Sequence, residues 1–378
     1  IRDFCLSRGL GDVYKRQVVG CLLVQYWHWR GLFVIVGAAA AVLAVLTTLY
    51  VPDQKIPKGG KFDWFSFLAV GMGCVCMLMV LIYGETDGWT APGVLAWMYG
   101  GFCSFALAFI SCMTHRTPLL DVRVLGNWRF LCGLLASLCN IFCICWVRVG
   151  TVQFMRNVMN YEPVGIAYVF MVLVAGFCGG AALVLPLMQK GRLALRVGMM
   201  AGLLALGASA FFLSRLDAGC SWLDVAWPLG LFGIGYAFCL NTATPLALRG
   251  VEGRSAAASS RTLNTVRYIF ISLYVSSVST VLAHMKTGFR FSLAEQVRDD
   301  SPGTAHTLDM WQRHFAETGG TAREIHASVD AVLQKAVALQ SQVFSVDTFY
   351  LCTVIVGAAG VLFALFCLKS SPERKAAS

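Results

Sequence analysis

The sequence predicts an all-α membrane protein that crosses a bilayer many times. Of its 378 residues, 57% are hydrophobic and only 13% are charged, whereas about 25% of the residues in a soluble domain are charged. The apolar residues come in blocks of roughly 20, the length that a helix needs to cross the hydrocarbon core. Because short polar loops separate these blocks, we expect a polytopic helical membrane protein.

The apolar blocks predict nine complete membrane-spanning helices. Their expected bounds are 31–51, 64–83, 92–113, 130–154, 165–188, 197–214, 225–247, 266–285 and 348–368. The shorter apolar stretch 18–24 is interpreted as the end of a further helix. Gly176 and Gly180 form a GxxxG pair, for which we expect close packing within the chain rather than dimerisation.

The segment 286–347 is too polar to cross a membrane and is expected on the outer face. A capping box at Thr321–Glu324 predicts an amphipathic helix that continues to about Phe344. Its apolar stripe is expected to pack on the outer vestibule or to lie at the membrane interface. The stripe consists of Ile325, Val329, Val332, Leu333, Ala336 and Val337.

The distribution of lysine and arginine predicts the orientation of the chain. Every second loop is basic. Because cytoplasmic loops of membrane proteins carry an excess of lysine and arginine, we expect the basic loops and the C-terminus in the cytoplasm. The net charge of +10 therefore reflects one membrane face and does not indicate a nucleic-acid partner. The basic set consists of Lys55, Lys58 and Lys61; Arg116, Arg123 and Arg129; Lys190, Arg192 and Arg196; Arg249, Arg254, Arg261 and Arg267; and Lys369, Arg374 and Lys375.

The cysteines and the motif content argue against metal binding and covalent catalysis. Most of the 15 cysteines lie inside apolar helices, where we interpret them as small packing residues with reduced thiols. The CxC pairs Cys74/Cys76 and Cys143/Cys145 point to opposite sides of a helix and cannot chelate one metal together. No GxxxxGK[ST] phosphate-binding motif occurs in the sequence. We therefore expect neither an enzyme nor a bound cofactor or metal.

Several short motifs resemble those of one transporter family. Gly191–Gly198 (GRLALRVG) resembles the G-x-L-a-D-r-x-G signature of the major facilitator superfamily, with Leu195 at the position of the acid. Other motifs resemble the fourteen-helix drug:proton antiporters, which are the multidrug-efflux branch of that superfamily. These are Gly20–Phe33, Phe62–Trp64, Pro118–Asp121, Asn127–Phe130, Asn157–Pro163 with Asn160 for the usual glycine, and Ser260–Ser272, which includes Asn264 and Arg267.

The resemblance implies a division of the chain. It assigns 18–51 to the end of the N-terminal half (the end of a fifth helix and the sixth), 52–113 to two linker helices and 114–369 to the C-terminal six-helix half. Residues 370–378 would be a cytoplasmic tail, and most of the N-terminal half would be absent. We hypothesise that residues 1–17 are not native, because Asp12–Gln17 looks like a translated sequencing adaptor; the alternative is an ordinary amphipathic segment.

The resemblance also implies a function, namely secondary active efflux of drugs or other amphipathic molecules by alternating access. A proton gradient would supply the energy without a cofactor, in the inner membrane of a bacterium. The partners would be lipid, substrate, protons and a periplasmic adaptor protein. The alternatives are a metabolite transporter of the same superfamily and a membrane scaffold or sensor that does not transport.

Polar residues within the predicted spans are the candidates for the substrate path, because such transporters bind substrate near the midplane. On the span 130–154 they are Asn140, Arg148 and Gln153, and on 225–247 they are Tyr236 and Asn241. For Asn140 and Asn241 the alternative is a hydrogen bond between helices, and Thr242 and Thr244 are expected to bond to their own helix. Candidates for the gate loops are Gly191, Arg192, Arg196, Gly198, Asn264 and Arg267.

Arg148 is the only charged residue well inside a predicted span, about 9 Å from its centre at about 1.5 Å per residue. Its side chain would either take part in the path, by attracting an anion or pairing with an acid, or reach the outer interface. No acid is expected at mid-membrane depth to pair with it, since Asp224 lies near the outer end of its helix.

Overall fold

A computed structural model describes residues 29–50, 63–114, 120–188, 192–248, 255–298, 310–314 and 322–369 of the chain. In these ranges the secondary structure consists of helices joined by short turns and loops, without a strand. Nine of the described helices are long and apolar enough to cross a membrane, which confirms the predicted fold class and number of spans. The predicted helix end at 18–24 and residues 1–17 lie outside the described ranges.

The helices follow the apolar blocks closely in the first part of the chain and extend beyond them near the C-terminus. They are α3 (Trp29–Tyr50), α4 (Trp64–Thr86), α5 (Pro92–Thr114), the 3-10 turn η1 (Val122–Gly126), α6 (Trp128–Asn157), α7 (Pro163–Met188), α8 (Arg192–Leu213), α9 (Trp222–Leu248), α10 (Ser255–Arg298) and α12 (Ala322–Lys369).

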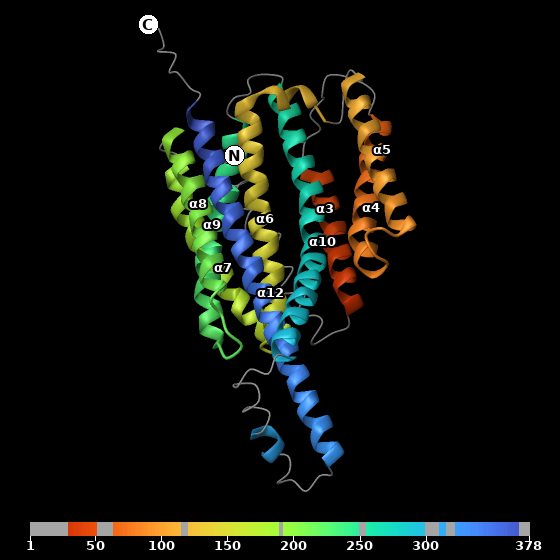
Figure 1. The fold of residues 1–378 in the computed structure, drawn as a ribbon. Coiled ribbons are helices and arrows are strands. Elements are labelled where there is room, and N and C mark those ends of the chain that lie inside the picture. Colours follow the sequence, from red (N-terminus) through yellow and green to blue (C-terminus); the bar gives the residue numbers. More distant parts are fainter. Residues whose placement is uncertain are drawn as a thin grey trace.

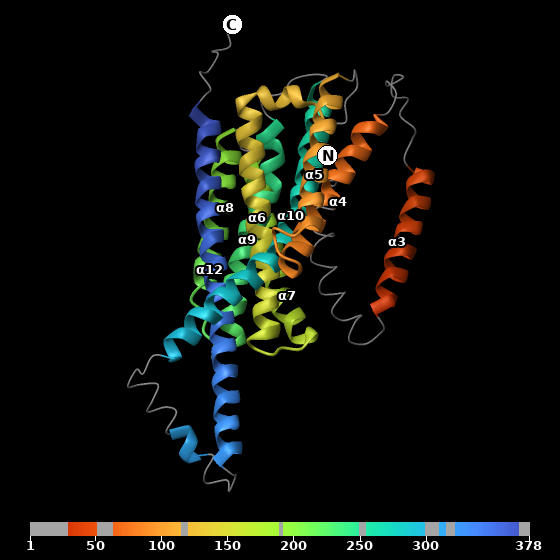
Figure 2. The same cartoon turned by 45° about the vertical axis from the view of Figure 1, so that its right-hand side comes forward.

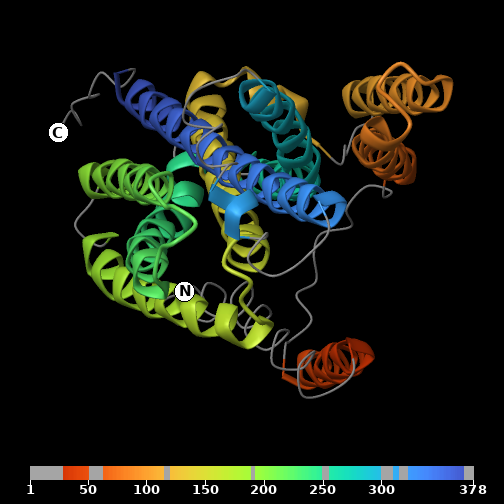
Figure 3. The ribbon, with the colours of Figure 1, turned by 60° about the horizontal axis from the view of Figure 1, so that its bottom comes forward.

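Six of these helices, α6 to α10 and α12, form one bundle (Figure 1). Within it α9 packs against α7 and α8, while α12 packs against α6 and α8, and α10 lies against α6 and α12. The pair α4 and α5 packs together and reaches the bundle through α10. Helix α3 stands apart from the others (Figures 2 and 3).

Glycines allow the bundle helices to approach each other closely. A Cβ atom added to Gly176 of α7 would lie 2.1 Å from the carbonyl oxygen of Gly230 in α9, and one on Gly180 would lie 2.8 Å from the Cα of Ile234. The neighbouring Gly179 has open space around the same position. The GxxxG pair is therefore a packing surface within the chain, as predicted.

The turn that follows α6 contains the one described non-glycine residue with a positive φ, Asn160 at 54°. The backbone N–H of Tyr161 donates to Met155 O at 2.9 Å, and that of Met159 donates to Phe154 O at 3.3 Å, so the end of the helix is closed by its own carbonyls. Asparagine tolerates the left-handed region better than most residues. This explains why the motif can carry asparagine where the resembling family has glycine.

The predicted bounds of the last two spans are wrong. Helix α10 continues to Arg298 and α12 already begins at Ala322, so the expected amphipathic helix and the last span form one continuous helix. At about 1.5 Å per residue, the 48 residues of α12 extend over roughly 72 Å, more than twice the hydrocarbon thickness of about 30 Å. Its N-terminal part projects beyond the bundle (Figure 1), and Val329 of the expected stripe is buried there.

Candidate functional site

Asn140 and Arg148 both lie on α6, which contributes many of the buried side chains of the bundle. Asn140 is 3% exposed, and its Oδ1 atom is buried without a hydrogen-bond partner among the described residues. Arg148, eight residues further along, is half-buried. The structure therefore places the Asn140 amide inside the bundle and leaves Arg148 partly exposed. Whether Asn140 lines a path remains a prediction.

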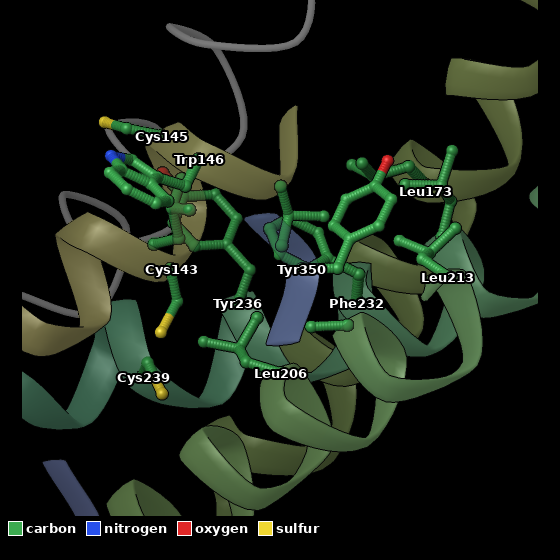
Figure 4. Close-up of a cluster of buried hydrophobic side chains, with 14 of the residues drawn as sticks. Cys143, Cys145, Trp146, Leu173, Leu206, Leu213, Phe232, Tyr236, Cys239 and Tyr350 are labelled. Atoms are coloured by element: carbon green, nitrogen blue, oxygen red, sulfur yellow. The ribbon is translucent and has the colours of Figure 1, made fainter. Parts of the chain in front are cut away.

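Tyr236 of α9, which was also selected from the sequence, lies within electrostatic range of Arg148. The guanidinium is close enough to act electrostatically on the Tyr236 phenol and on the Cys145 thiol. Tyr236 is buried in the core cluster beside Cys239 and Phe232 (Figure 4). The ring of Phe177 in α7 packs against its ring, with 5.2 Å between the centroids. The structure thus brings α6, α7 and α9 together at two of the predicted residues.

The other path candidates are less closely connected. Asn241 is half-buried, and its Nδ2 donates to the carbonyl of Ala237 in its own helix at 2.8 Å, so its amide does not join two helices. Gln153 is also half-buried. Thr242 donates to Phe238 O at 2.7 Å, which confirms the expected bond within its own helix.

Arg267 of α10 forms the most developed polar junction in the bundle. Its Nε donates to Oγ of Ser137 in α6 at 2.6 Å, and its Nη1 donates to Oγ1 of Thr244 in α9 at 2.7 Å. The expectation that Thr244 bonds to its own helix is therefore wrong, because its hydroxyl accepts a bond from Arg267 of α10. One side chain holds three helices together through two short hydrogen bonds to hydroxyl groups.

The structure describes five of the six gate-loop candidates, and they do not all lie at one site. Gly191 lies outside the described residues, Arg192 begins α8, and Arg196 is half-buried. A Cβ atom added to Gly198 would lie 2.9 Å from Cγ2 of Thr242, so this glycine permits close packing of α8 on α9. Asn264 is exposed on α10 and does not share the junction of Arg267.

Asp347 was missed as a candidate because it was placed before the last span. It lies within α12, inside the apolar stretch Ala327–Phe366, and its Oδ1 atom is buried without a hydrogen-bond partner among the described residues. The charged group that acts on it is Asp217, in the loop between α8 and α9. Because Asp217 belongs to this loop, Asp347 lies near the same end of the bundle, and the expectation of no acid at mid-membrane depth stays a prediction.

An aromatic stack on α6 was also missed. Trp146 stacks on Phe349 of α12 with 4.1 Å between ring centroids and an interplanar angle of 3°, and it lies 4.1 Å from Phe142. Phe142 in turn packs edge-on against Tyr274 of α10. The sequence could not predict which rings contact each other, because the rings that pack on Trp146 and Phe142 come from helices far apart in the chain.

The thiols of the bundle behave as packing groups. Cys143 is fully buried, and its Sγ donates weakly to Thr353 O in α12 at 3.6 Å. Within the described ranges, no group of three His, Cys, Asp or Glu side chains could hold a metal ion.

Comparison with known proteins relates this architecture to transporters. No protein-family model matches the chain. The multidrug resistance protein Stp of Mycobacterium tuberculosis is 26% identical over 316 residues, covering 79% of this chain and 58% of Stp. The probable actinorhodin transporter of Streptomyces coelicolor is 23% identical over 322 residues, covering 79% of this chain and 52% of that protein. The chain is a homologue of major facilitator multidrug transporters.

These relatives confirm the resemblance inferred from the motifs, and the protein is integral to a membrane. The chain spans a little more than half the length of the curated relatives it matches. A solved bacterial homologue of the human lysosomal transporter Spinster, in an inward-facing conformation, aligns over 79% of this chain and 68% of its own, with 14% identity and a TM-score of 0.43.

Proposed function

We propose that the protein works as a secondary active transporter that exports drugs or other amphipathic small molecules by alternating access. The observation that carries this proposal is the similarity to Stp, a multidrug resistance protein, along 79% of the chain. The bundle of α6 to α10 and α12 supports it, because these helices hold polar side chains in an otherwise apolar interior. The polar groups would orient a substrate that the apolar surroundings bind without much selectivity.

A proton gradient is proposed as the energy source, with no bound cofactor and no covalent chemistry. The proposed location is the inner membrane of a bacterium with the C-terminus in the cytoplasm. The arrangement of the bundle supports this orientation, since α6 begins and α12 ends at the same end of it, where basic residues are frequent (Figure 1). Lipid, substrate and protons are proposed partners, together with a periplasmic adaptor protein.

Different roles are proposed for the two arginines of the interior. Arg267 would hold α10 to α6 and α9 in one state of the cycle and would release at least one hydroxyl in another. Arg148 and Tyr236, with Gln153 and Asn241, would lie along the substrate path. Asn140, which is buried, would contribute the hydrogen-bond acceptor nearest the centre of α6.

The test is efflux from everted membrane vesicles of a bacterial host that lacks its main pumps and expresses the complete reading frame. Energised vesicles are expected to accumulate ethidium or fluorescein, and a protonophore should abolish the accumulation. Arg267→Met should reduce it at unchanged membrane levels, whereas Arg156→Gln, an exposed position at the end of α6, should not. Accumulation that survives the protonophore would refute proton coupling.

A scaffold or sensor that does not transport is the second candidate. One observation favours it: Leu195 replaces the acid of the gate motif and is 6% exposed, so this position packs against the bundle and cannot supply a carboxylate. Absence of flux for every compound, with the protein present in the membrane at normal levels, would support the scaffold. Flux restricted to metabolites would indicate a metabolite transporter of the same superfamily.

A further inference from the structure

The indole N–H of Trp146 is a buried hydrogen-bond donor that finds no acceptor among the described residues. Trp146 lies on α6 and is 7% exposed, and its Nε1 atom is buried without a hydrogen-bond partner. Buried tryptophans usually donate this proton to a partner, and a donor that loses water without gaining an acceptor is costly. An unpaired buried group of this kind requires a physical explanation.

Aromatic side chains of three helices meet at Trp146. Phe349 of α12 stacks on its ring, with 4.1 Å between the centroids and 3° between the planes, and Phe142 of α6 lies 4.1 Å away. Tyr274 of α10 packs edge-on against Phe142 at 5.2 Å, and Phe270 lies 5.4 Å from Tyr274. The rings therefore form a continuous row from α12 through α6 to α10. Phe142 and Tyr274 are only half-buried, so this row is partly accessible where α6 and α10 meet.

An aromatic ligand explains the unpaired donor better than a bound water molecule does. A buried water needs two to four polar partners, whereas the two rings that pack on Trp146, those of Phe142 and Phe349, are apolar. An oxygen atom on an aromatic ligand would meet both conditions at once. The oxygen would accept the indole N–H, and the aromatic body of the ligand would keep the surroundings apolar.

Trp146 also lies at the depth where secondary transporters bind their substrates, near the midplane of the membrane. The midpoint of α6 (Trp128–Asn157) falls between residues 142 and 143, so Trp146 is roughly 5 Å from it at about 1.5 Å per residue. We propose that Trp146 is the hydrogen-bond donor of a binding subsite for planar aromatic compounds that carry a hydrogen-bond acceptor, such as aryl ketones. This inference rests on the proposed transport function and specifies a substrate class for it.

The experiment compares two ligands of nearly the same shape, 2-acetylnaphthalene and 2-isopropenylnaphthalene, in which a C=CH2 group replaces the C=O group. Equilibrium dialysis measures their binding to the purified full chain in lipid nanodiscs, and protein-free nanodiscs of the same lipid correct for partitioning. The unmodified protein is expected to bind the ketone about fivefold more tightly. This ratio corresponds to about 1 kcal/mol, the usual contribution of a neutral hydrogen bond.

Two variants separate the donor from the aromatic row. Trp146→Phe keeps a ring but lacks the N–H, so it should remove the preference and leave binding of the alkene within about twofold. Phe142→Leu keeps the donor but loses one ring, so it should weaken binding of both compounds by about threefold and retain the preference. The matched control, Trp227→Phe at an exposed position of α9, should bind both compounds as the unmodified protein does.

Four outcomes would overturn the inference. Equal binding of ketone and alkene to the unmodified protein would show that no unpaired donor selects the ligand. A preference that survives in Trp146→Phe would place the donor elsewhere, and an equal loss of both compounds in that variant would make Trp146 a structural residue. Unchanged binding in Phe142→Leu, which decides the matter if Trp146→Phe does not fold, would show that the row does not hold the ligand. The efflux assay distinguishes these failures from failure of the proposed function, because export of ethidium, which has no carbonyl group, can persist without this selectivity.

Discussion

Replacement of Thr244 by valine is expected to weaken the junction at Arg267. The hydroxyl of Thr244 accepts a hydrogen bond from Nη1 of Arg267 at 2.7 Å, and Ser137 accepts one from Nε at 2.6 Å. Valine keeps the branched shape of threonine but cannot accept the bond. The guanidinium would then keep a single partner in this junction and remain only partly compensated.

Two measured scales bound the size of this effect. A hydrogen bond to a charged group contributes about 1.5–3 kcal/mol in soluble proteins, whereas hydrogen bonds between membrane helices average about 0.6 and reach about 1.7 kcal/mol. Arg267 is charged, half-buried and still bonded to Ser137 in the variant. We therefore expect the free energy of unfolding to fall by about 1.5 kcal/mol, near the upper membrane value.

The matched control is Thr242→Val on the same helix. The Thr242 hydroxyl donates to Phe238 O at 2.7 Å, within α9, and lies 3.6 Å from the Met199 sulfur of α8, so its removal breaks only a weak contact between helices. We expect a change below about 0.5 kcal/mol for a bond of this kind. Unfolding in mixed micelles with increasing SDS, followed by circular dichroism, measures both variants. A loss in Thr244→Val no larger than in Thr242→Val would refute the reasoning.

Two further predictions concern packing and orientation. Gly176→Val should prevent accumulation of folded protein, because the new Cβ would lie 2.1 Å from Gly230 O, whereas Gly179→Val, with open space at that position, should fold normally; size-exclusion profiles in detergent compare them. Burial, and secondarily the carboxylate of Asp224, raises the pKa of the Cys220 thiol in the loop between α8 and α9. A membrane-impermeant maleimide should therefore label Cys220 slowly near pH 7 and faster as the pH rises and the thiolate forms, and only from the side opposite the C-terminus. Cys220→Ser is the control that identifies the labelled residue. Labelling of Cys220 from the C-terminal side of the membrane would contradict the predicted topology.

Local features of the sequence were enough to predict the spans and their packing surfaces. A helix must satisfy its backbone hydrogen bonds inside lipid, so each block of about 20 apolar residues marks one span regardless of its neighbours. The same holds for Gly176 and Gly180, whose spacing places both on one face of α7. The unusual backbone of Asn160 was also foreseeable, because Asn160 stands in the Asn157–Pro163 motif at the position where the resembling family has glycine.

The sequence did not predict how far α10 and α12 extend. The apolar signal stops where the lipid ends, but the helix continues as long as its backbone bonds and side-chain contacts are favourable. Phe289 of α10 packs against Phe344 of α12 with 6.0 Å between ring centroids, outside the predicted spans of both helices. This contact joins residues that are 55 positions apart in the sequence, so no local pattern contains it.

The polar residues of the interior show the same division. The sequence by itself determined that Asn140, Arg148, Tyr236 and Arg267 lie in or beside membrane helices, because an apolar run surrounds each of them. Only the tertiary structure decided that Arg267 bonds to Ser137 and Thr244, and that the ring of Phe177 packs against that of Tyr236. The physical reason is that hydropathy reflects the medium around one helix, whereas hydrogen bonds and charge contacts depend on which faces of different helices meet.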